Sequence, residues 1–283
     1  METGLLLTIK KVTKKTINTT LEKSNHHQLS IQFTLDGFSF CITNLDSKKT
    51  LHFCEYTFEK SLKTPDNLVK EIETIFKENS FLQEDFKEIL VIHQNNLSAL
   101  VPDAFFNEKN LKDYLGYTIK TLATDFFAFD SLPSIQTQNV YIPFVNVNNY
   151  LFQNFGEFEY KHASSIFIEK LLQNTSAEEK TMYVDVRKQH FSIVILEKKQ
   201  LLFSNSFSFE TKEDFIYYIL FTAEQLGLDA DKFPLFFTGE IEKDAQIYKI
   251  TYQYIRNIHF LESENPIFIG SSFSNHTNYI LLG

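Results

Sequence analysis

The sequence predicts an α/β protein of two lobes, and two observations lead to this prediction. Residues 181–240 show the pattern of three strands in a meander, followed by a helix and a fourth strand. Residues 29–92 show the same order of elements. Because strands and helices that alternate in this way build layered α/β folds, the repeat predicts two lobes, each a mixed sheet flanked by helices.

The strands of the second copy are short runs of apolar and β-branched residues. Met182–Val186 and Phe191–Leu196 are two such runs, and the polar Arg187–Gln189 predicts the turn between them. From Leu201 to Phe209 the mainly apolar set Leu201, Phe203, Asn205, Phe207 and Phe209 alternates with Ser204, Ser206 and Ser208, which predicts a strand with one face on a core. The apolar run Leu235–Phe237 predicts the fourth strand of this copy.

A helix is predicted between the third and fourth strands of the second copy, over Lys212–Leu226. Thr211 is the expected N-cap, because Glu213 and Asp214 then lie in the first turn, where carboxylates meet the positive end of the helix dipole. Gly227 follows the last apolar residue and predicts the end of the helix.

The first copy has the same succession of apolar runs and turns. Asp36-Gly37 is a dipeptide typical of a hairpin turn, and Thr64-Pro65 predicts a helix start. The strands expected in this copy are 31–35, 38–43, 51–58 and 88–92.

Between the copies the pattern is less regular, and it predicts elements of both kinds. Helices are expected over Asp103–Leu115, 147–155 and 164–172, strands over Val140–Phe144 and 157–161, and a loop over Asp125–Gln138. The polar stretch 174–179 predicts a boundary. We therefore expect a first lobe at 1–175 and a second at 176–283, with the last 20 or so residues returning to the cleft between them.

The chain has only two cysteines, Cys41 and Cys54. A hairpin that turns at Ser47-Lys48 would place them opposite each other. Opposed Cβ atoms lie about 4.5 to 5.5 Å apart, farther than the mean of about 3.8 Å in a disulfide. We therefore expect two free, buried thiols, as in a reducing compartment.

Composition excludes several classes of function. The net charge of −9 argues against a nucleic-acid partner, because such proteins present a basic face. The apolar patch Leu5–Leu7 is too short for a secretion signal, and no run of about 20 apolar residues would span a membrane. These features predict a cytoplasmic protein without a membrane partner. The 30 phenylalanines predict a core filled largely with phenylalanine.

The repeated order of strand, strand, strand, helix and strand resembles the superfamily of actin, sugar kinases and heat-shock ATPases. That resemblance implies a two-lobed, duplicated ribonuclease-H-like fold. Length and element order also resemble a small bacterial family of unknown function within the superfamily. In the superfamily, a hairpin at the start of each lobe holds the β- and γ-phosphates of ATP, Mg²⁺ is held by aspartates through water, and a glycine-rich loop meets the adenosine.

Four segments occupy the positions where the superfamily has its functional loops and its first connecting helix. Asp36-Gly37 lies at the first phosphate loop, although the family spacing is Asp, any residue, then Gly. Asp185 to Gln189, with Arg187 and Lys188, lies at the second, where the family has glycines after the Asp. Gly239 is a single glycine at the adenosine loop, where two are usual. Residues 159–172 resemble the connecting helix, without its proline.

The missing glycines bear on the chemistry of the second loop. Glycine lets backbone N–H groups approach a phosphate without a Cβ in the way, whereas Val186 is β-branched and stiff. Arg187 and Lys188 could instead offer side-chain charge to a phosphate, or they could be solvated turn residues. The histidines are scattered without the spacing of a metal site, so no metal ligands and no catalytic residues are assigned.

Two functions of different class follow from these observations. The favoured one is a pseudo-ATPase, a non-catalytic cytoplasmic scaffold of bacterial origin that binds an unidentified protein partner and needs no cofactor. The alternative is an active ATPase or a sugar-kinase-like phosphotransferase that uses MgATP in the cleft. In that alternative Asp36, Gly37, Asp185, Arg187, Lys188 and Gly239 would bind the nucleotide.

Overall fold

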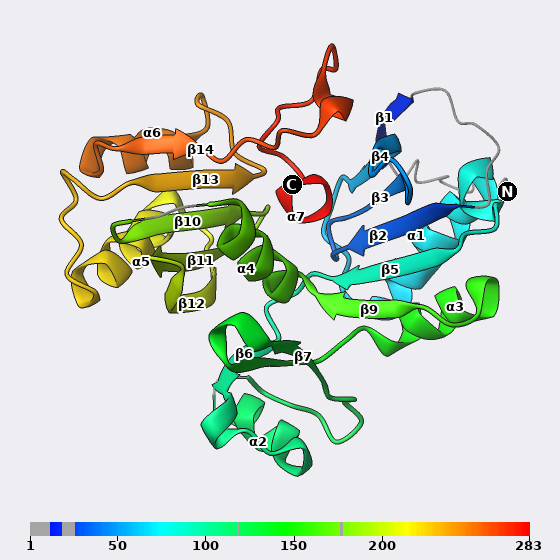
Figure 1. The fold of residues 1–283 in the computed structure, drawn as a ribbon, viewed down its shortest axis with the longest axis horizontal. Coiled ribbons are helices and arrows are strands. Elements are labelled where there is room, and N and C mark those ends of the chain that lie inside the picture. The colour runs from blue at the N-terminus through cyan, green and yellow to red at the C-terminus, as the bar shows by residue number, and fades with distance from the viewer. Residues whose placement is uncertain (1–11, 19–25, 118, 176–177) are drawn as a thin grey trace, which may run out of the picture. The chain divides into compact units, whose positions relative to one another are not determined.

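The computed structural model describes residues 12–18, 26–117, 119–175 and 178–283 (Figure 1). The chain forms two compact units. The first contains Met1–Leu90 and Phe144–Phe158, and the second contains Val91–Pro143 and Glu159–Gly283. The predicted division into lobes at 1–175 and 176–283 stays a prediction. The N-terminal patch Leu5–Leu7 and residues 176–177 of the predicted linker lie outside the described residues.

The meander predicted for the first copy is confirmed. Strands β2, β3 and β4 pair antiparallel in sequence order, and β1 pairs antiparallel with β4. Their sheet has the order β1-β4-β3-β2-β5-β9 (Figure 1). Its strands are β1 (Val12–Asn18), β2 (His27–Phe33), β3 (Gly37–Asn44), β4 (Thr50–Phe58), β5 (Glu88–His93) and β9 (Glu159–His162). β1 was not predicted, because its exposed, lysine-bearing sequence has no apolar face.

Helices cover the first-unit core as their patterns predict. Helix α1 (Pro65–Glu78) begins after Thr64, whose side chain accepts a hydrogen bond from the Asn67 N–H. Helix α3 (Val145–Phe155) packs on α1, and the Phe76 ring lies 5.6 Å from that of Phe155 between centroids. A 3-10 turn, η1 (Ser80–Gln83), follows α1.

The cysteine register differs from the prediction. Cys41 lies opposite Phe53, and Cys54 lies opposite Phe40, so the two thiols are one residue out of register and point to opposite faces of the sheet. The pair Thr43–Thr50 centres the turn on Asp46-Ser47, one residue before the predicted Ser47-Lys48, and the bulge between Ile42 and Thr43 corrects only part of this difference. Both thiols are free and buried, as expected.

The second unit repeats the meander. β10, β11 and β12 pair antiparallel, β13 is parallel to β10, and β14 is parallel to β13. The sheet order β12-β11-β10-β13-β14 matches β4-β3-β2-β5-β9 element for element, which confirms the repeated order of strands. The strands are β10 (Thr181–Val186), β11 (His190–Glu197), β12 (Gln200–Ser208), β13 (Leu235–Gly239) and β14 (Ile258–Phe260).

Two helices pack on the core of this sheet. Thr211 caps α5 (Lys212–Gln225) in a capping box with Asp214, as the sequence predicts. Gly227 follows the helix in the left-handed region, with a φ of 63°. Helix α6 (Gln246–Tyr254) adds side chains to the same core. The expected phenylalanine core is confirmed: fully buried rings in the chain include those of Phe33, Phe38, Phe40, Phe53, Phe167, Phe191, Phe215 and Phe237.

The segment before the second sheet departs most from the predictions. The expected helix over Asp103–Leu115 is broken into η2 (Asp103–Phe105), η3 (Glu108–Asn110) and α2 (Leu111–Gly116), because the extended Phe106 ends the first turn and the Asn107 side chain caps the next. The expected loop over Asp125–Gln138 contains a strand. The strands β6 (Ser98–Pro102), β7 (Ala128–Leu132) and β8 (Thr137–Tyr141) form a sheet of order β6-β8-β7, with η4 (Pro133–Ile135) as the turn between β7 and β8.

The C-terminal residues pack within the second unit. Helix α7 (Tyr279–Leu282) lies on α4 (Ala163–Asn174), and the ring centroids of Phe167 and Tyr279 are 6.2 Å apart. A short turn, η5 (Pro266–Phe268), precedes it. The return of these residues to a cleft between lobes stays a prediction. Among the described helices, none has the length and apolar character needed to cross a membrane.

Candidate functional site

The candidate site lies where two parallel strands of the second unit end side by side. Asp185 is opposite Thr238, and Val186 is opposite Gly239, in the pairing of β10 with β13. The carboxyl ends of adjacent parallel strands are the usual place for ligands in α/β sheets. The structure therefore brings together Asp185 and Gly239, which the sequence assigned to a phosphate loop and to the adenosine loop.

The Asp185 carboxylate is buried and both of its oxygens are engaged. The residue is 2% exposed. Arg187 Nε donates to Oδ2 at 3.1 Å, and the Arg187 Nη2 donates to Oδ1 at 3.3 Å. Gln94 Nε2 donates to Oδ2 at 3.0 Å. An arginine that grips a carboxylate by two donors makes a strong, directional pair.

Arg187 is turned back onto its own strand. Its side chain is only 7% exposed, and its Nη1 lies 3.8 Å from the Glu240 carboxylate. The Arg187 N–H donates to the His190 carbonyl at 2.9 Å and closes the turn between β10 and β11. Lys188, the other basic residue of the turn, is exposed. Arg187 and Lys188, which we considered together as possible phosphate ligands, thus have different surroundings.

Gly239 is required by the close approach of the two strand ends. Its φ is 86°, and a Cβ at this position would lie 2.2 Å from the Val186 carbonyl oxygen and 3.0 Å from Asp185 Oδ1. The following residue, Glu240, donates its N–H to the same Val186 oxygen at 2.7 Å. A glycine is therefore needed here for packing, whether or not a nucleotide binds.

Asp36 lies in a hairpin turn of the first unit that closes on itself. The Thr34 hydroxyl accepts hydrogen bonds from the N–H groups of Asp36, at 2.9 Å, and of Gly37, at 3.1 Å. The Asp36 carbonyl accepts from the Phe58 N–H at 2.8 Å, and its carboxylate accepts from the Ser61 hydroxyl. Local hydrogen bonds therefore engage both N–H groups and the carboxylate of this turn.

Gly37 is held in place by the neighbouring strand. A Cβ on Gly37 would lie 2.6 Å from the Tyr56 carbonyl oxygen. The pairing of β3 with β4 therefore requires glycine at this position, as the approach to Val186 requires Gly239. In both turns the resemblance to phosphate and adenosine loops rests on residues that also have a packing role.

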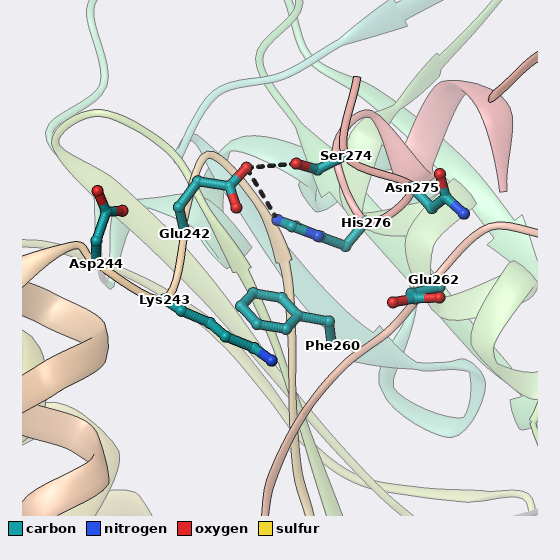
Figure 2. Close-up of a pocket in the computed structure, with 8 residues that line it drawn as sticks. All are labelled: Glu242, Lys243, Asp244, Phe260, Glu262, Ser274, Asn275 and His276. Carbon is teal, nitrogen blue, oxygen red and sulfur yellow. Dashed lines mark hydrogen bonds and ion pairs between the residues drawn. The ribbon is translucent and has the colours of Figure 1, made fainter. Parts of the chain in front are cut away.

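An open pocket lies beyond the end of β13 (Figure 2). It has a volume of about 610 Å³ and is lined by Glu242, Lys243, Asp244, Phe260, Glu262, Ser274, Asn275 and His276. Ser274 Oγ donates to the Glu242 carboxylate at 2.5 Å, and the His276 Nε2 lies 3.8 Å from the same carboxylate. This pocket was not predicted, because its residues come from three separate segments of the chain.

The chemistry of this pocket is limited by how His276 is held. Its Nε2 lies 2.7 Å from the Ile241 carbonyl, to which it must donate, so this nitrogen is not placed to act as a base. The pocket is more acidic than basic, with Glu242, Asp244 and Glu262 against Lys243. Among the described residues, no three His, Cys, Asp or Glu side chains gather as a metal site.

A buried polar network holds the start of α4, the helix that resembles the superfamily's connecting helix. The Asp130 carboxylate of β7 accepts hydrogen bonds from the His162 N–H at 2.8 Å, the Ser165 hydroxyl at 2.5 Å and the Tyr141 hydroxyl at 3.1 Å. Asn139 of β8 donates to Ser165 at 2.8 Å. The small hydroxyl residues of this helix thus tie it to the β6-β8-β7 sheet.

His162 in this network is neutral. Its Nδ1 accepts a hydrogen bond from the Ser164 N–H at 3.2 Å, which needs an unprotonated nitrogen. Burial, with a further contribution from the nearby His93, lowers the pKa of His162 to about 3. Burial also raises the pKa of Asp130, against the effect of its hydrogen-bond donors.

We expect stability to fall in mild acid because of His162. The folded pKa of about 3 lies below the unfolded value near 6.5, so below pH 6.5 the unfolded chain takes up a proton that the folded protein does not. The contribution is intact above pH 6.5 and is lost as the pH falls toward 3. Between pH 7 and pH 5 the wild type should lose about 2 kcal/mol more unfolding free energy than a His162→Asn variant. Urea unfolding at both pH values measures this, and equal losses in the two proteins would contradict it.

Gly239→Ala should destabilise the protein more than Gly227→Ala does. Both glycines have positive φ, but a Cβ at Gly227 would meet nothing within 4 Å, whereas at Gly239 it would meet the Val186 backbone. The matched control therefore carries only the cost of the left-handed conformation, about 1 to 2 kcal/mol. Gly239→Ala should cost about 1 to 3 kcal/mol more, measured by chemical unfolding. Equal costs would show that the strand ends do not approach this closely.

Several solved structures are similar to this chain and identify its fold. A Bacteroides thetaiotaomicron protein described as having an actin-like ATPase fold and unknown function is similar at 24% identity, with a TM-score of 0.76 over 84% of this chain and 92% of that chain. The PilM-PilN type IV pilus biogenesis complex contains a similar chain, with 10% identity and a TM-score of 0.55, covering 84% of this chain and 89% of that one.

A third similar structure is the ethanolamine utilization protein EutJ from Carboxydothermus hydrogenoformans, with 6% identity and a TM-score of 0.50 over 94% of this chain and 93% of that chain. No functionally curated protein matches the chain. At these identities the likeness shows the fold alone, and it confirms the expected two-lobed α/β fold of the actin-like ATPase type. A family profile described as a protein of unknown function matches residues 16–258. The chain therefore belongs to the DUF3822 family of proteins of unknown function.

Proposed function

We propose that the protein is a non-catalytic scaffold, a pseudo-ATPase whose nucleotide loops have become internal connections and which binds a protein partner in the bacterial cytoplasm. The observation that carries this proposal is the buried ion pair of Asp185 with Arg187. The fold is one in which such an aspartate would be expected to face a nucleotide. In this chain the negative charge of Asp185 is balanced by Arg187 of the same chain.

The ion pair opposes the binding of magnesium at Asp185. Mg²⁺ keeps several of its waters and is held in protein sites by carboxylates that remain accessible to it. Here both Asp185 oxygens receive N–H donors, and the nearest charge is a guanidinium that repels a cation. A magnesium ion would have to displace Arg187 and leave a buried positive charge without its partner, which costs several kcal/mol.

The backbone of the same turn offers little to a phosphate. A phosphate loop presents successive free N–H groups to the ligand. The Arg187 N–H is bonded to His190, and the Glu240 N–H of the adjoining turn is bonded to Val186. These two donors are used within the protein, which leaves the charge of Lys188, the fold and the pocket beyond β13 as support for nucleotide binding.

The alternative is a working ATPase or phosphotransferase, and one observation favours it. The open pocket beyond β13 lies close in sequence to Gly239, the position of the adenosine loop in the superfamily. In this alternative Asp36 and Asp185 would hold Mg²⁺, while Arg187 and Lys188 would contact phosphate. It requires Arg187 to leave Asp185 when the nucleotide arrives.

Membership of protein complexes is consistent with the proposed role. A chain of similar fold is part of the PilM-PilN type IV pilus biogenesis complex. That likeness concerns the fold and does not identify the partner of this protein. The partner is therefore proposed only as a protein.

Millimolar MgATP should raise the melting temperature by less than about 2 °C. A ligand at 100 times its Kd stabilises a protein by about 2.7 kcal/mol, which corresponds to a shift of roughly 5 to 10 °C for a protein of this size. Thermal unfolding with and without MgATP measures the shift. Lys188→Ala is the control, because a small shift that disappears in this variant reports anion binding by one exposed side chain.

A large shift in melting temperature with MgATP would contradict the proposal if it depended on both aspartates. The shift would have to reach the full 5 to 10 °C and to vanish in both Asp36→Ala and Asp185→Ala. That result would show that the two aspartates bind the nucleotide together, and the enzyme alternative would replace the scaffold.

A further inference from the structure

Strand β12 forms an uncovered edge of the second-unit sheet (Figure 1). It pairs with β11 on one side, and in the described part of the chain no strand pairs with its other side. Its nine residues, Gln200–Ser208, contain no charged residue and no proline. Proteins usually protect such an edge with lysine, proline or a covering element, because its outward N–H and C=O groups will pair with another strand.

The first-unit sheet shows how the corresponding edge is completed. Its third meander strand, β4, takes the place that β12 takes in the second sheet. There the chain itself adds an antiparallel strand, β1, which pairs with residues 52–58 of β4. The outer strand β1 carries Lys14 and Lys15, the kind of charge that ends a sheet. The second sheet therefore has the same strand order, but among the described residues no strand covers β12 as β1 covers β4.

Aromatic side chains lie beside this edge on helix α5. Tyr218 stacks on Phe207 of β12 with ring centroids 4.7 Å apart, so this part of α5 lies against the edge strand. The preceding residue, Tyr217, is 59% exposed, and it stacks on Phe221, which is 46% exposed, with ring centroids 5.9 Å apart. An exposed aromatic pair next to an uncovered strand is typical of a surface that contacts another protein.

We propose that β12 pairs antiparallel with β12 of a second copy of this chain, so that the two second-unit sheets join into one continuous sheet. The strand is self-complementary in this arrangement. Full overlap places Gln200 opposite Ser208 of the second copy and Phe203 opposite Asn205, with Phe203 and Phe207 of both copies on the face that α5 covers. This dimer is independent of whether the protein binds a nucleotide.

Charge at the two ends of β12 fits the same register. Lys198 precedes the strand, in a turn where it and Lys199 have positive φ, and Glu210 follows it. Full antiparallel overlap brings Lys198 of each copy to the end where Glu210 of the other copy lies. The two-fold symmetry makes this contact twice. A parallel arrangement would instead bring lysine to lysine and glutamate to glutamate.

The helices would meet along the same symmetry axis. Helix α5 follows β12 and packs on it, so pairing of the two strands brings the α5 helices of the two copies alongside each other on one face of the joined sheet. Tyr217 and Phe221 would then be buried between them. Strand pairing supplies backbone hydrogen bonds, and the aromatic residues supply the apolar contact that an interface core needs.

Charge reversal at the ends of β12 tests the dimer. Sedimentation equilibrium from about 1 to 100 µM gives the dimerisation constant. Lys198→Glu alone, and Glu210→Lys alone, should each weaken the dimer about tenfold, because two cross-strand pairs become repulsive. The double variant, which reverses both charges, should restore the wild-type constant. Such rescue is specific for contact between residues 198 and 210.

The matched control is Lys48→Glu. Lys48 has positive φ in the hairpin turn between β3 and β4, beside the edge that β1 covers, so its reversal should leave the dimer unchanged. A wild type that stays monomeric at 100 µM overturns the proposal, as does a dimer that the reversals do not weaken. Tyr217→Ser/Phe221→Ser should also weaken the dimer at least tenfold without lowering the melting temperature by more than a few degrees. A dimer that this variant leaves unchanged would overturn the role of α5.

Discussion

The structure at the ends of β10 and β13 depends on the ion pair of Asp185 with Arg187. Two charges removed from water lose several kcal/mol each, and their attraction compensates only when geometry is good and the remaining hydrogen-bonding capacity is met. Here the guanidinium meets both carboxylate oxygens, Gln94 adds a third donor, and Glu240 lies on the other side of the arginine. The aspartate is therefore stable in the absence of any ligand.

The backbone groups around this ion pair also form hydrogen bonds within the protein. Val186 accepts from Glu240, and Gly239 has no Cβ because Val186 and Asp185 occupy that space. The His276 carbonyl accepts from the Gly239 N–H at 3.0 Å and from the Thr238 hydroxyl at 2.5 Å. Side chains and backbone together make this end of the sheet a closed structure. In the scaffold that we propose, the actin-like fold is kept while the residues at these strand ends pack against one another.

Local patterns in the sequence predicted the repeated elements but not the surroundings of the site. The capping box at Thr211 was predictable because all its parts lie within one turn of helix. The role of Arg187 was not, because its direction depends on its pairing with the buried Asp185, and Gln94, which fixes that carboxylate, is distant in sequence. The strand β7 was missed because Ser131 within it, and Pro133 and Ser134 in the turn η4 that follows, are typical of loops. Residues that act through distant partners leave no local pattern.

A double-mutant cycle between Asp185 and Arg187 tests the central claim most directly. The variants Asp185→Asn and Arg187→Met, alone and combined, are compared by the free energy of unfolding in urea. Each single change should cost about 3 to 5 kcal/mol, because it leaves the other charge buried without its partner. The double variant should cost at least about 2 kcal/mol less than the sum of the two. If the double variant differs from the sum of the single variants by less than about 0.5 kcal/mol, the two side chains do not hold each other. Asp185 would then remain available to a cation.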